Sequence, residues 1–407
     1  MKPKIKISDF NYPLPDERIA KFPLEKRDSS KLLVYNKGVI EDSLFSSLAD
    51  FLPQDSFMVF NNTKVVPARL FFRKPTGAVI EILCLNPVAP EDYVTSFASV
   101  GECAWKAVVG NAKKWKDGEI YFMGDEKSGK LNFRASLMHK GDSMESVVRF
   151  KWDAPVTFSE VLDICGQVPI PPYLNRKTQA IDRTRYQTIY AKQEGSVAAP
   201  TAGLHFTDDV LRTLDAKRIL RENICLHVGA GTFVPVKSEF IDGHKMHSEP
   251  FSVSKEFVKS LMDVKPGQKV ISVGTTSTRC LESLYYIGVH CIENKLDLSG
   301  TVPAPVGQWE PYETSPAYSL KESLEGILEF LEKNSLNRLV AGTSIIIVPG
   351  YKFKVVDIQI TNFHQPQSTL LLLISAIVGD DWKRIYSHAL DNGYRFLSYG
   401  DSSVLFR

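Results

Sequence analysis

The chain has 407 residues, of which 43% are hydrophobic and 24% are charged, and its formal net charge is +2. This length predicts two or three domains, and the near-zero charge excludes a basic field over the whole surface. The six cysteines form no CxxC pair, so we expect reduced, mostly buried thiols in a cytoplasmic protein. The longest apolar run, which begins at Leu370, is far shorter than the ~20 residues of a membrane span.

The first part of the chain predicts short alternating elements. Residues 31–36 and 56–62 have the pattern of strands, and residues 45–52 have that of a helix. From residue 70 to residue 152, short apolar–polar alternations are separated by Gly, Pro, Asn or Asp, with almost no helical period. This texture predicts a small antiparallel β-barrel inserted at 70–152.

After residue 152 helical periods alternate with strand-like segments, which indicates an α/β unit. The helical segments are 208–219, 256–264 and 323–332, and the strand-like segments are 224–229, 269–274, 344–351 and 355–363. We expect an α/β fold, in which residues 1–69 and 153–407 form a mixed α/β main domain with a barrel-like sheet and flanking helices. The Pro- and Gly-rich stretch 300–316 predicts a long surface loop.

Several predicted strands end in small polar residues, the position at which α/β folds bind ligands. In one case Gly274 leads through Thr275, Thr276 and Ser277 into a helix, whose first N–H groups suit an anion. Arg279 in the first turn could bind the same anion through two N–H groups. Ordinary capping of the helix by Thr276 or Ser277 is the alternative.

Histidines follow other predicted strands. Thr361, Asn362 and His364 precede a turn and a buried helix that Ser368 would cap. The segment at residue 227 combines His227 with Gly229, Gly231 and Thr232, and its glycines allow a ligand to approach the backbone. The group His244, His247 and Glu249 has neither an i, i+4 histidine pair nor an HExxH motif, so we predict no metal site there.

Residues 186–207 raise a question that core packing does not answer, because Pro200, Thr201, Gly203 and His205 stand close together. Two further groups combine polar residues with turn signals. They are Asn61, Asn62, Thr63 and Arg69 near the start of the predicted barrel, and Tyr399 and Asp401 beside Gly400. Simple turns and a surface ion pair are the alternative interpretation of these groups.

Together these stretches resemble the S-adenosylmethionine:tRNA ribosyltransferase-isomerase family of queuosine biosynthesis. The matching stretches occur in the family's order and begin near residue 4. They are FNNTKVVPARL, YQTIYAKQEGSVAAPTAGLHF, LHVGAGTFVPVK, MHSEPF, VGTTSTRCLES, VVDIQITNFHQPQSTLLLLISAIVG and YRFLSYGDSSVLF.

The resemblance implies that S-adenosylmethionine is a co-substrate that donates its ribosyl group. The acceptor is 7-aminomethyl-7-deazaguanine at the wobble position of tRNA, and the products are epoxyqueuosine-tRNA, adenine and methionine. The implied partners are S-adenosylmethionine and the tRNA anticodon loop, without a membrane, and we expect a monomer without a metal. Like the texture of the chain, the family's architecture is an α/β domain with an inserted β-barrel.

The same resemblance assigns roles to residues. Base and acid are expected among His205, His227, His247 and His364, which the sequence does not rank. Pro200, Thr201 and Gly203 would form a wall against the nucleoside, with His205 pointing into it. The helix that begins at Thr275 would hold the methionine carboxylate together with Arg279. The remaining substrate-binding candidates are Asn61, Asn62, Thr63, Arg69, Gly229, Gly231, Thr232, Glu249, Thr361, Asn362, Tyr399 and Asp401.

Two basic patches are candidates for tRNA contacts. Lysines interleave with Trp105 and Trp115 in the predicted barrel, a mixture that suits phosphates and unstacked bases. These lysines are Lys106, Lys113, Lys114 and Lys116. Protection of an edge strand by lysines is the alternative. The second patch consists of Arg176, Lys177, Arg183 and Arg185.

The chain departs from the family pattern at several positions. Lys64 stands where arginine is common, and Glu194-Gly195-Ser196 replaces a usual Pro-Gly-Ala stretch. Such changes leave open a paralogue with an altered acceptor. A metal-dependent hydrolase that uses the same histidines is a competing interpretation, and so is a non-catalytic RNA-binding protein.

Overall fold

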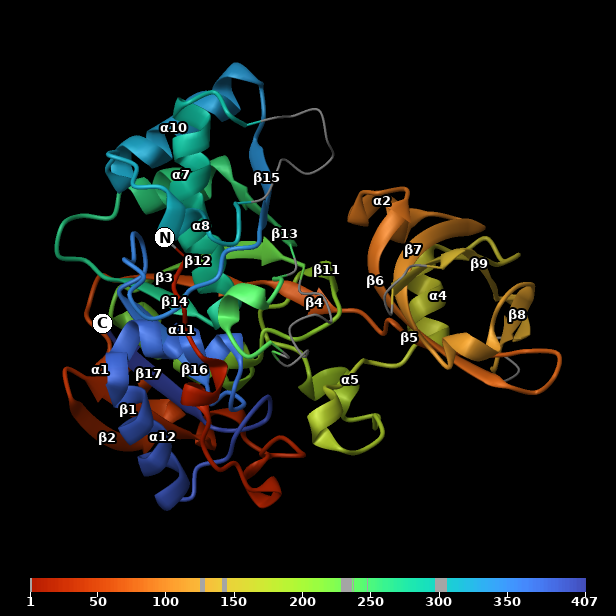
Figure 1. The fold of residues 1–407 in the computed structure, drawn as a ribbon, viewed down its shortest axis with the longest axis horizontal. Coiled ribbons are helices and arrows are strands. Elements are labelled where there is room, and N and C mark those ends of the chain that lie inside the picture. Colours follow the sequence, from red (N-terminus) through yellow and green to blue (C-terminus); the bar gives the residue numbers. More distant parts are fainter. Residues whose placement is uncertain are drawn as a thin grey trace.

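A large mixed sheet and a separate closed barrel organise the chain (Figure 1). The structure is a computed structural model, and it describes residues 2–124, 129–140, 145–227, 236, 238–246, 248–296 and 306–407. The sheet has nine strands in the order β15-β13-β12-β3-β14-β16-β17-β1-β2. Their bounds are β1 Lys31–Asn36, β2 Val39–Leu44, β3 Phe57–Asn61, β12 Leu220–Leu226, β13 Glu249–Ser254, β14 Val270–Val273, β15 Arg338–Thr343, β16 Ile358–Asn362 and β17 Ser402–Phe406.

The centre of this sheet is parallel, and this arrangement positions the candidate site. β12, β3, β14 and β16 run in the same direction as neighbours, so their carboxyl ends meet at one edge. β3, β14 and β16 are buried at every residue, as parallel strands covered on both faces should be. β17 is antiparallel to β16, so its first residue, Ser402, pairs with Asn362 at the end of β16.

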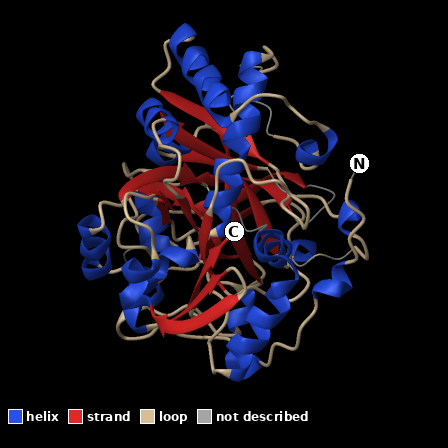
Figure 2. Ribbon diagram, turned by 90° about the vertical axis from the view of Figure 1, so that its left-hand side faces the viewer, coloured by secondary structure: helices blue, strands red, loops and turns tan. Residues whose placement is uncertain are grey.

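Alternating side chains of each strand enter two different hydrophobic cores. Leu33 of β1 and Val59 of β3 belong to the larger core, whereas Leu32 and Met58 belong to the core on the other face. Figure 2 shows helices on both sides of the sheet. The larger core is covered by α7 Lys255–Met262, α8 Thr275–Ile292, α10 Leu320–Lys333, α11 Thr369–Val378 and α12 Trp382–Asp391. The opposite core is covered by α1 Leu48–Phe51, α6 Asp208–Ala216 and the 3-10 helix Thr201–His205.

The barrel closes in the order β10-β7-β6-β5-β8-β9, with every pair antiparallel. Its strands are β5 Arg69–Arg73, β6 Val79–Ala89, β7 Glu102–Gly110, β8 Glu119–Phe122, β9 Arg134–Lys140 and β10 Glu145–Lys151. The helix α4, Phe158–Cys165, buries Phe158, Val161 and Leu162 in the barrel core. The domain limits remain a proposal, and this packing favours a second limit after Cys165 rather than at residue 152.

The mixed α/β class with a closed all-β barrel is thus confirmed, and so are most predicted elements. The segment 344–351 is not a strand, because the strand β15 ends at Thr343 and the following residues bond elsewhere. Ser344 N–H donates to Val306 O and Ile346 N–H donates to Gln308 O. The apolar side chains of residues 345–348 fill the larger core, so their hydrophobicity reflects burial and not strand pairing.

The predicted surface loop at 300–316 is also wrong in its described part, residues 306–316. Val306 pairs with Thr343 in a parallel bridge, and Val306 and Trp309 are both buried in the larger core. A short helix, α9 Glu310–Glu313, follows. All six cysteines are free thiols, and all but Cys291 are buried. No helix in the described ranges has the length and apolarity that a membrane crossing requires.

Replacing Trp309 by Ala is expected to lower the free energy of unfolding by about 3–5 kcal/mol, because it removes a core side chain. Trp309 is 8% exposed, whereas Val94 is 78% exposed, so Val94→Ala is a surface control. The control should change stability by less than about 0.5 kcal/mol. Urea unfolding followed by circular dichroism measures both. A Trp309 variant as stable as the control would restore the surface-loop interpretation.

Candidate functional site

The carboxyl ends of β14 and β16 open into a cavity of about 110 Å³, hereafter the main cavity. Its wall comes from segments far apart in the chain, which are 198–202, 274–276, 361–370 and 397–398, together with Tyr173. Seven predicted site residues meet here: Pro200, Thr201, Thr275, Thr276, Thr361, Asn362 and His364. The position agrees with the rule that α/β sheets bind ligands beyond the carboxyl ends of their strands.

One side of the main cavity is the N-terminus of α8. The helix begins directly after Gly274, whose φ of 91° favours glycine, and no described side chain caps it. Ser277 Oγ instead donates to Val273 O at 2.8 Å beneath the helix, so the predicted capping by Thr276 or Ser277 is wrong. Since Thr275 and Thr276 line the cavity, the uncapped end of α8 lies at its wall, and the free N–H groups of a helix start suit an anion.

Arg279 does not reach the main cavity. Its guanidinium is buried and donates to Glu249 at 2.6 Å and to Ile345 O at 3.0 Å. The contacts tie α8 to β13 and to the segment after β15. The two residues were predicted as substrate ligands, but in this structure they form a buried ion pair within the sheet region. Arg279 lies one turn along α8 from Thr275, on the same helix face, but its bonds to Glu249 and Ile345 O direct its side chain toward β13 and the segment after β15.

His364 lines the same cavity and is held at three points. Its Nε2 is 2.9 Å from Thr361 Oγ1, its main-chain N–H donates to Tyr386 Oη at 3.1 Å, and Tyr12 Oη donates to its carbonyl oxygen. Burial lowers the pKa of His364, so the imidazole is neutral near pH 7. A neutral imidazole can accept a proton from a bound molecule.

His205 lies one layer behind the wall and does not line the main cavity. Its Nε2 is 3.1 Å from Asn362 Nδ2, and its Nδ1 is 2.8 Å from Ser30 Oγ. With the Asn362 amide as donor, the proton of the ring lies on Nδ1 and is donated to Ser30. Burial, with smaller effects of Arg395 and Arg27, lowers the pKa of His205 to about 3. The expectation that His205 points into the cavity is therefore wrong, because both ring nitrogens are engaged in a buried network.

His227 lies in a different place, between the sheet and the barrel. Its ring stacks on Tyr93 of α2, Tyr93–Ala98, with centroids 4.0 Å apart, and its Nδ1 is 3.0 Å from Gly195 O. Burial lowers the pKa of His227 as well. It lines a cavity of about 1240 Å³ that also includes Glu249. His247, Gly229, Gly231 and Thr232 lie outside the described residues.

The small residues of 198–203 divide into two roles. Pro200 and Thr201 line the main cavity as expected, together with Ala198, Ala199 and Ala202. Gly203 does not line it, and a Cβ there would lie 1.9 Å from Tyr190 Oη. Glycine at 203 is thus explained by the close approach of Tyr190, not by contact with a nucleoside.

Other predicted ligands hold loops in place. Buried Asn61 accepts from Thr63 N–H and from Leu226 N–H, each at 3.2 Å, and so joins the ends of β3 and β12. Asn62 donates its main-chain N–H to Ile224 O in the same region. Arg69 pairs with Glu81 at 2.7 Å on the barrel. None of these residues lines the main cavity.

Tyr399 and Asp401, near the C-terminus, also hold the chain in place. Tyr399 Oη donates to Asp182 at 2.8 Å, and buried Asp401 accepts from Arg395 Nη2 at 2.8 Å. Both residues are near the main cavity in sequence, since Leu397 and Ser398 line it. Tyr399 lines a second, smaller cavity. Asp401 does not line it but binds Arg395, which does.

Sequence reasoning missed Tyr173, Gln365, Gln367, Leu397 and Ser398, which complete the main cavity. Leu397 and Gln367 have φ values of 68° and 54°, which bulky side chains rarely adopt. Strained backbone of this kind gathers at functional sites. It is invisible in the sequence, because neither leucine nor glutamine is a typical residue for a left-handed conformation.

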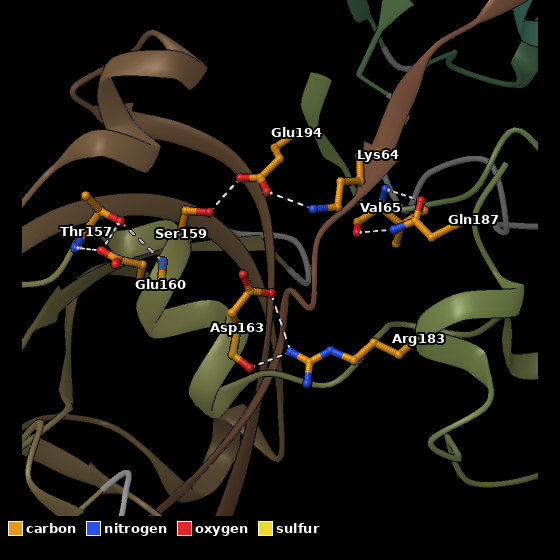
Figure 3. A network of polar contacts seen from close by, with 9 residues as sticks. All are labelled: Lys64, Val65, Thr157, Ser159, Glu160, Asp163, Arg183, Gln187 and Glu194. Carbon is orange, nitrogen blue, oxygen red and sulfur yellow. Dashed lines mark hydrogen bonds and ion pairs between the residues drawn. The ribbon is translucent and has the colours of Figure 1, made fainter. Parts of the chain in front are cut away.

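The junction between barrel and sheet contains the two departures from the family pattern (Figure 3). Lys64 of β4, Thr63–Val65, pairs with Glu194 of β11, Gln193–Ser196, at 3.1 Å in a two-stranded parallel sheet. Ser159 of α4 donates to the other carboxylate oxygen of Glu194 at 2.5 Å. Because β11 continues into residues 198–202, the barrel is linked directly to a wall of the main cavity.

The predicted basic and aromatic patch of the barrel is not aromatic at its surface. Trp105 and Trp115 are 2% and 1% exposed and belong to the barrel core, so they cannot stack on bases. The alternative of a protected edge strand is also wrong for Lys106, because β7 pairs with a neighbour on both sides. Lys113 and Lys114 lie in the short 3-10 helix after β7, and Lys116 follows it.

The second patch separates into structural contacts. Arg176 binds both carboxylate oxygens of Asp182, and Arg183 pairs with Asp163 of α4. Arg185 donates to Leu24 O and Glu25 O, and Lys177 O accepts from Arg176. Of these residues only Arg185 lines a described cavity. In the described part of the chain no cluster of His, Cys, Asp and Glu is arranged to hold a metal ion.

Comparison with known proteins places the chain in a family. The family model described as "Queuosine biosynthesis protein" matches residues 7–405. The chain belongs to this family. A curated relative from Halothermothrix orenii, S-adenosylmethionine:tRNA ribosyltransferase-isomerase, is 38% identical over 406 residues, which is 98% of this chain and 100% of the relative. A solved structure of an S-adenosylmethionine tRNA ribosyltransferase from Thermotoga maritima is 26% identical and has a TM-score of 0.46, with 98% of this chain and 99% of that chain covered. The resemblance seen in the motifs is confirmed.

Replacing Glu249 by Gln is expected to lower the free energy of unfolding by about 3–5 kcal/mol, because the Arg279 charge would stay buried without its counter-ion. Glu313→Gln is the matched control, since Glu313 pairs with Lys2 at an exposed site. The control should cost at most about 1 kcal/mol. Urea titration measures both. Equal losses would show that the pair is not a supporting element of the sheet.

His205 should make the folded chain less stable as the pH is lowered. Its pKa is about 3 in the folded chain, below the usual value near 6.5, so the unfolded chain binds the additional proton. The contribution of neutral His205 to the free energy of unfolding is complete above about pH 6.5. As the pH falls toward 3, this contribution is lost at ~1.4 kcal/mol per pH unit. Between pH 7 and pH 5 the free energy of unfolding, measured with urea, should fall by about 2 kcal/mol more for the wild type than for His205→Gln. Identical slopes would contradict a buried neutral His205.

Proposed function

We propose that the chain transfers the ribosyl group of S-adenosylmethionine to 7-aminomethyl-7-deazaguanine at the tRNA wobble position and isomerises it. The products are epoxyqueuosine-tRNA, adenine and methionine. The observation that carries this proposal is the convergence of residues 200–201, 275–276 and 361–364 on one cavity. Family membership and the name of the curated relative support the same reaction class.

The two sides of the main cavity suit the two ends of the sulfonium substrate. The uncapped N-terminus of α8, with Thr275 and Thr276, favours the methionine carboxylate. The neutral imidazole of His364, which also lines this cavity, is available as the base that takes a proton from the sugar carbon beside sulfur. Ala199, Pro200 and Thr201 line the same cavity with small side chains, which leave room for a base ring.

Asn362 connects this cavity with His205 and thereby adds a polar group to the wall. Its Nδ2 bonds to the His205 ring, and its buried Oδ1 has no hydrogen-bond partner among the described residues. An unpaired buried acceptor is costly unless a ligand satisfies it. We assign Asn362 Oδ1 to a donor of the substrate, and His205 to the positioning of the Asn362 amide.

The departures at 64 and 194 do not favour an altered acceptor. Lys64 and Glu194 are register neighbours and form one ion pair, so each change accommodates the other. Their contacts lie at the barrel junction, and neither side chain lines the main cavity. We therefore propose the acceptor that the family resemblance implies.

The test is to incubate the protein with S-adenosylmethionine and tRNA that carries the aminomethyl-deazaguanine base. Adenine release should match the mass gain of the nucleoside. His364→Ala should lower turnover about 10²- to 10⁴-fold, as expected for loss of a general base. His388→Ala removes a partly exposed histidine that pairs with Asp42 outside the main cavity, and it should keep wild-type turnover.

Two outcomes would count against these assignments. A wild-type protein that releases no adenine with the modified tRNA would reject the reaction. A His364→Ala variant with near wild-type turnover would leave the reaction in place and remove His364 as the base.

A further inference from the structure

Three arginines converge on a second, smaller cavity beside the main one. Arg27 comes from the 3-10 helix Arg27–Ser29, Arg185 from the end of α5, Asp182–Arg185, and Arg395 from the loop before β17. Hereafter these three residues are the arginine cluster. The cavity measures about 20 Å³ and shares Ser398 with the main cavity. His205 lines it too.

Arg27 and Arg185 of the arginine cluster are held by main-chain oxygens, whereas Arg395 pairs with the carboxylate of Asp401. Arg27 donates to the carbonyl oxygens of Gln187, Leu204 and Thr184. Arg185 donates to those of Leu24 and Glu25. These bonds fix the direction of two guanidinium groups without neutralising either charge. A preorganised guanidinium loses less conformational freedom when it binds an anion.

The donors of the cluster are not exhausted by these contacts. Each guanidinium has five N–H groups. Arg185 Nε is buried and has no hydrogen-bond partner among the described residues. Within the described part of the chain, the Arg395 side chain bonds to a single partner, Asp401, at 2.8 Å. Several N–H groups therefore remain for a ligand.

The charge of the cluster is also unbalanced. The described lining of this cavity contains three arginines and no Asp or Glu, and only Arg395 has a carboxylate partner, Asp401. Burial, and next the neighbouring Arg185, lower the pKa of Arg27. Like charges held at close range destabilise a site until an anion arrives.

We propose that the arginine cluster binds a phosphodiester group of the tRNA substrate, next to the nucleotide whose base enters the main cavity. The planar forks of several guanidinium groups match phosphate oxygens, and such contacts fix the register of a nucleic acid strand. A base in the main cavity carries a phosphate on either side of its sugar, and the shared Ser398 makes the two cavities neighbours. The assignment rests on the proposed function, which supplies the nucleic acid.

A carboxylate of the sulfonium substrate is the competing anion. It has a separate candidate position at the N-terminus of α8, on the main cavity. Arg27 and Arg185 have no carboxylate partner among the described residues, so one carboxylate would leave one of the two positive charges unpaired. A carboxylate and a phosphodiester each offer two oxygens and one negative charge, but the phosphodiester belongs to a chain of negative charges and therefore fits the cluster better.

The first test measures tRNA affinity against salt for the wild type and for Arg185→Gln. Loss of one phosphate contact should make the slope of log affinity against log salt less steep by about 0.7–0.9. Affinity for S-adenosylmethionine should stay unchanged. Arg212→Gln is the matched control, because Arg212 is an exposed arginine of α6 that pairs with Asp209. It should leave the slope unchanged.

The salt slope decides between the candidates. An unchanged slope for Arg185→Gln would overturn the proposal. A loss of S-adenosylmethionine affinity without a change in slope would assign the cluster to the carboxylate and would also overturn it. Adenine release by the wild type with modified tRNA reports separately on the proposed function, so failure of one is distinguishable from failure of the other.

A second measurement changes the RNA and begins with the wild-type protein. In a synthetic anticodon stem-loop, neutral methylphosphonates replace, one at a time, the two phosphates that flank the wobble nucleotide. One of these replacements should weaken binding to the wild type, and that loss should disappear with Arg395→Gln. Inorganic phosphate alone should compete with the unmodified stem-loop. Competition without any effect of the methylphosphonates would indicate a free-anion site and overturn the assignment to tRNA.

Discussion

The candidate site depends on one hydrogen bond between neighbouring parallel strands, from Gly274 N–H to Ile360 O at 2.8 Å. It aligns the ends of β14 and β16, so that the first residues of α8 face the segment Thr361–His364 across one cavity. Gly274 can make this bond and still begin the helix because its φ is 91°, a value that a side chain disfavours. Without this turn the two strand ends would not line one cavity.

Around this point buried polar contacts hold neighbouring segments together. The Arg279–Glu249 pair lies beneath α8, the Asn61 side chain joins β3 to β12, and His205 links Ser30 with Asn362. Each of these groups is costly to bury alone, and the cost falls when its hydrogen-bond partner is buried with it. The residues looked like ligands in the sequence because ligand-binding and bracing sites draw on the same polar residues. Their partners, not their identities, separate the two roles.

The barrel reaches the site through its junction and not through its own surface. Ser159, Glu194 and Lys64 connect α4 with β11 and β4, and β11 leads into the wall at 198–202 (Figure 3). The position of the barrel is therefore mechanically linked to one wall of the cavity. The arginine cluster lies on another side, beside Ser398 and His205. If tRNA reaches both, its contacts surround the cavity from two directions.

Local patterns in the sequence determined the elements, the fold class and the small polar clusters at strand ends, because hydrophobic period and turn chemistry act over a few residues. The family also followed from local motifs. Tertiary structure alone decided that Thr276 and His364 share a cavity while His205 lies behind it and His227 lies at the barrel. It also placed Trp105 and Trp115 inside the barrel and brought Arg27, Arg185 and Arg395 together. The physical reason is that the direction and the neighbours of a side chain depend on packing between segments more than a hundred residues apart, which no local period encodes.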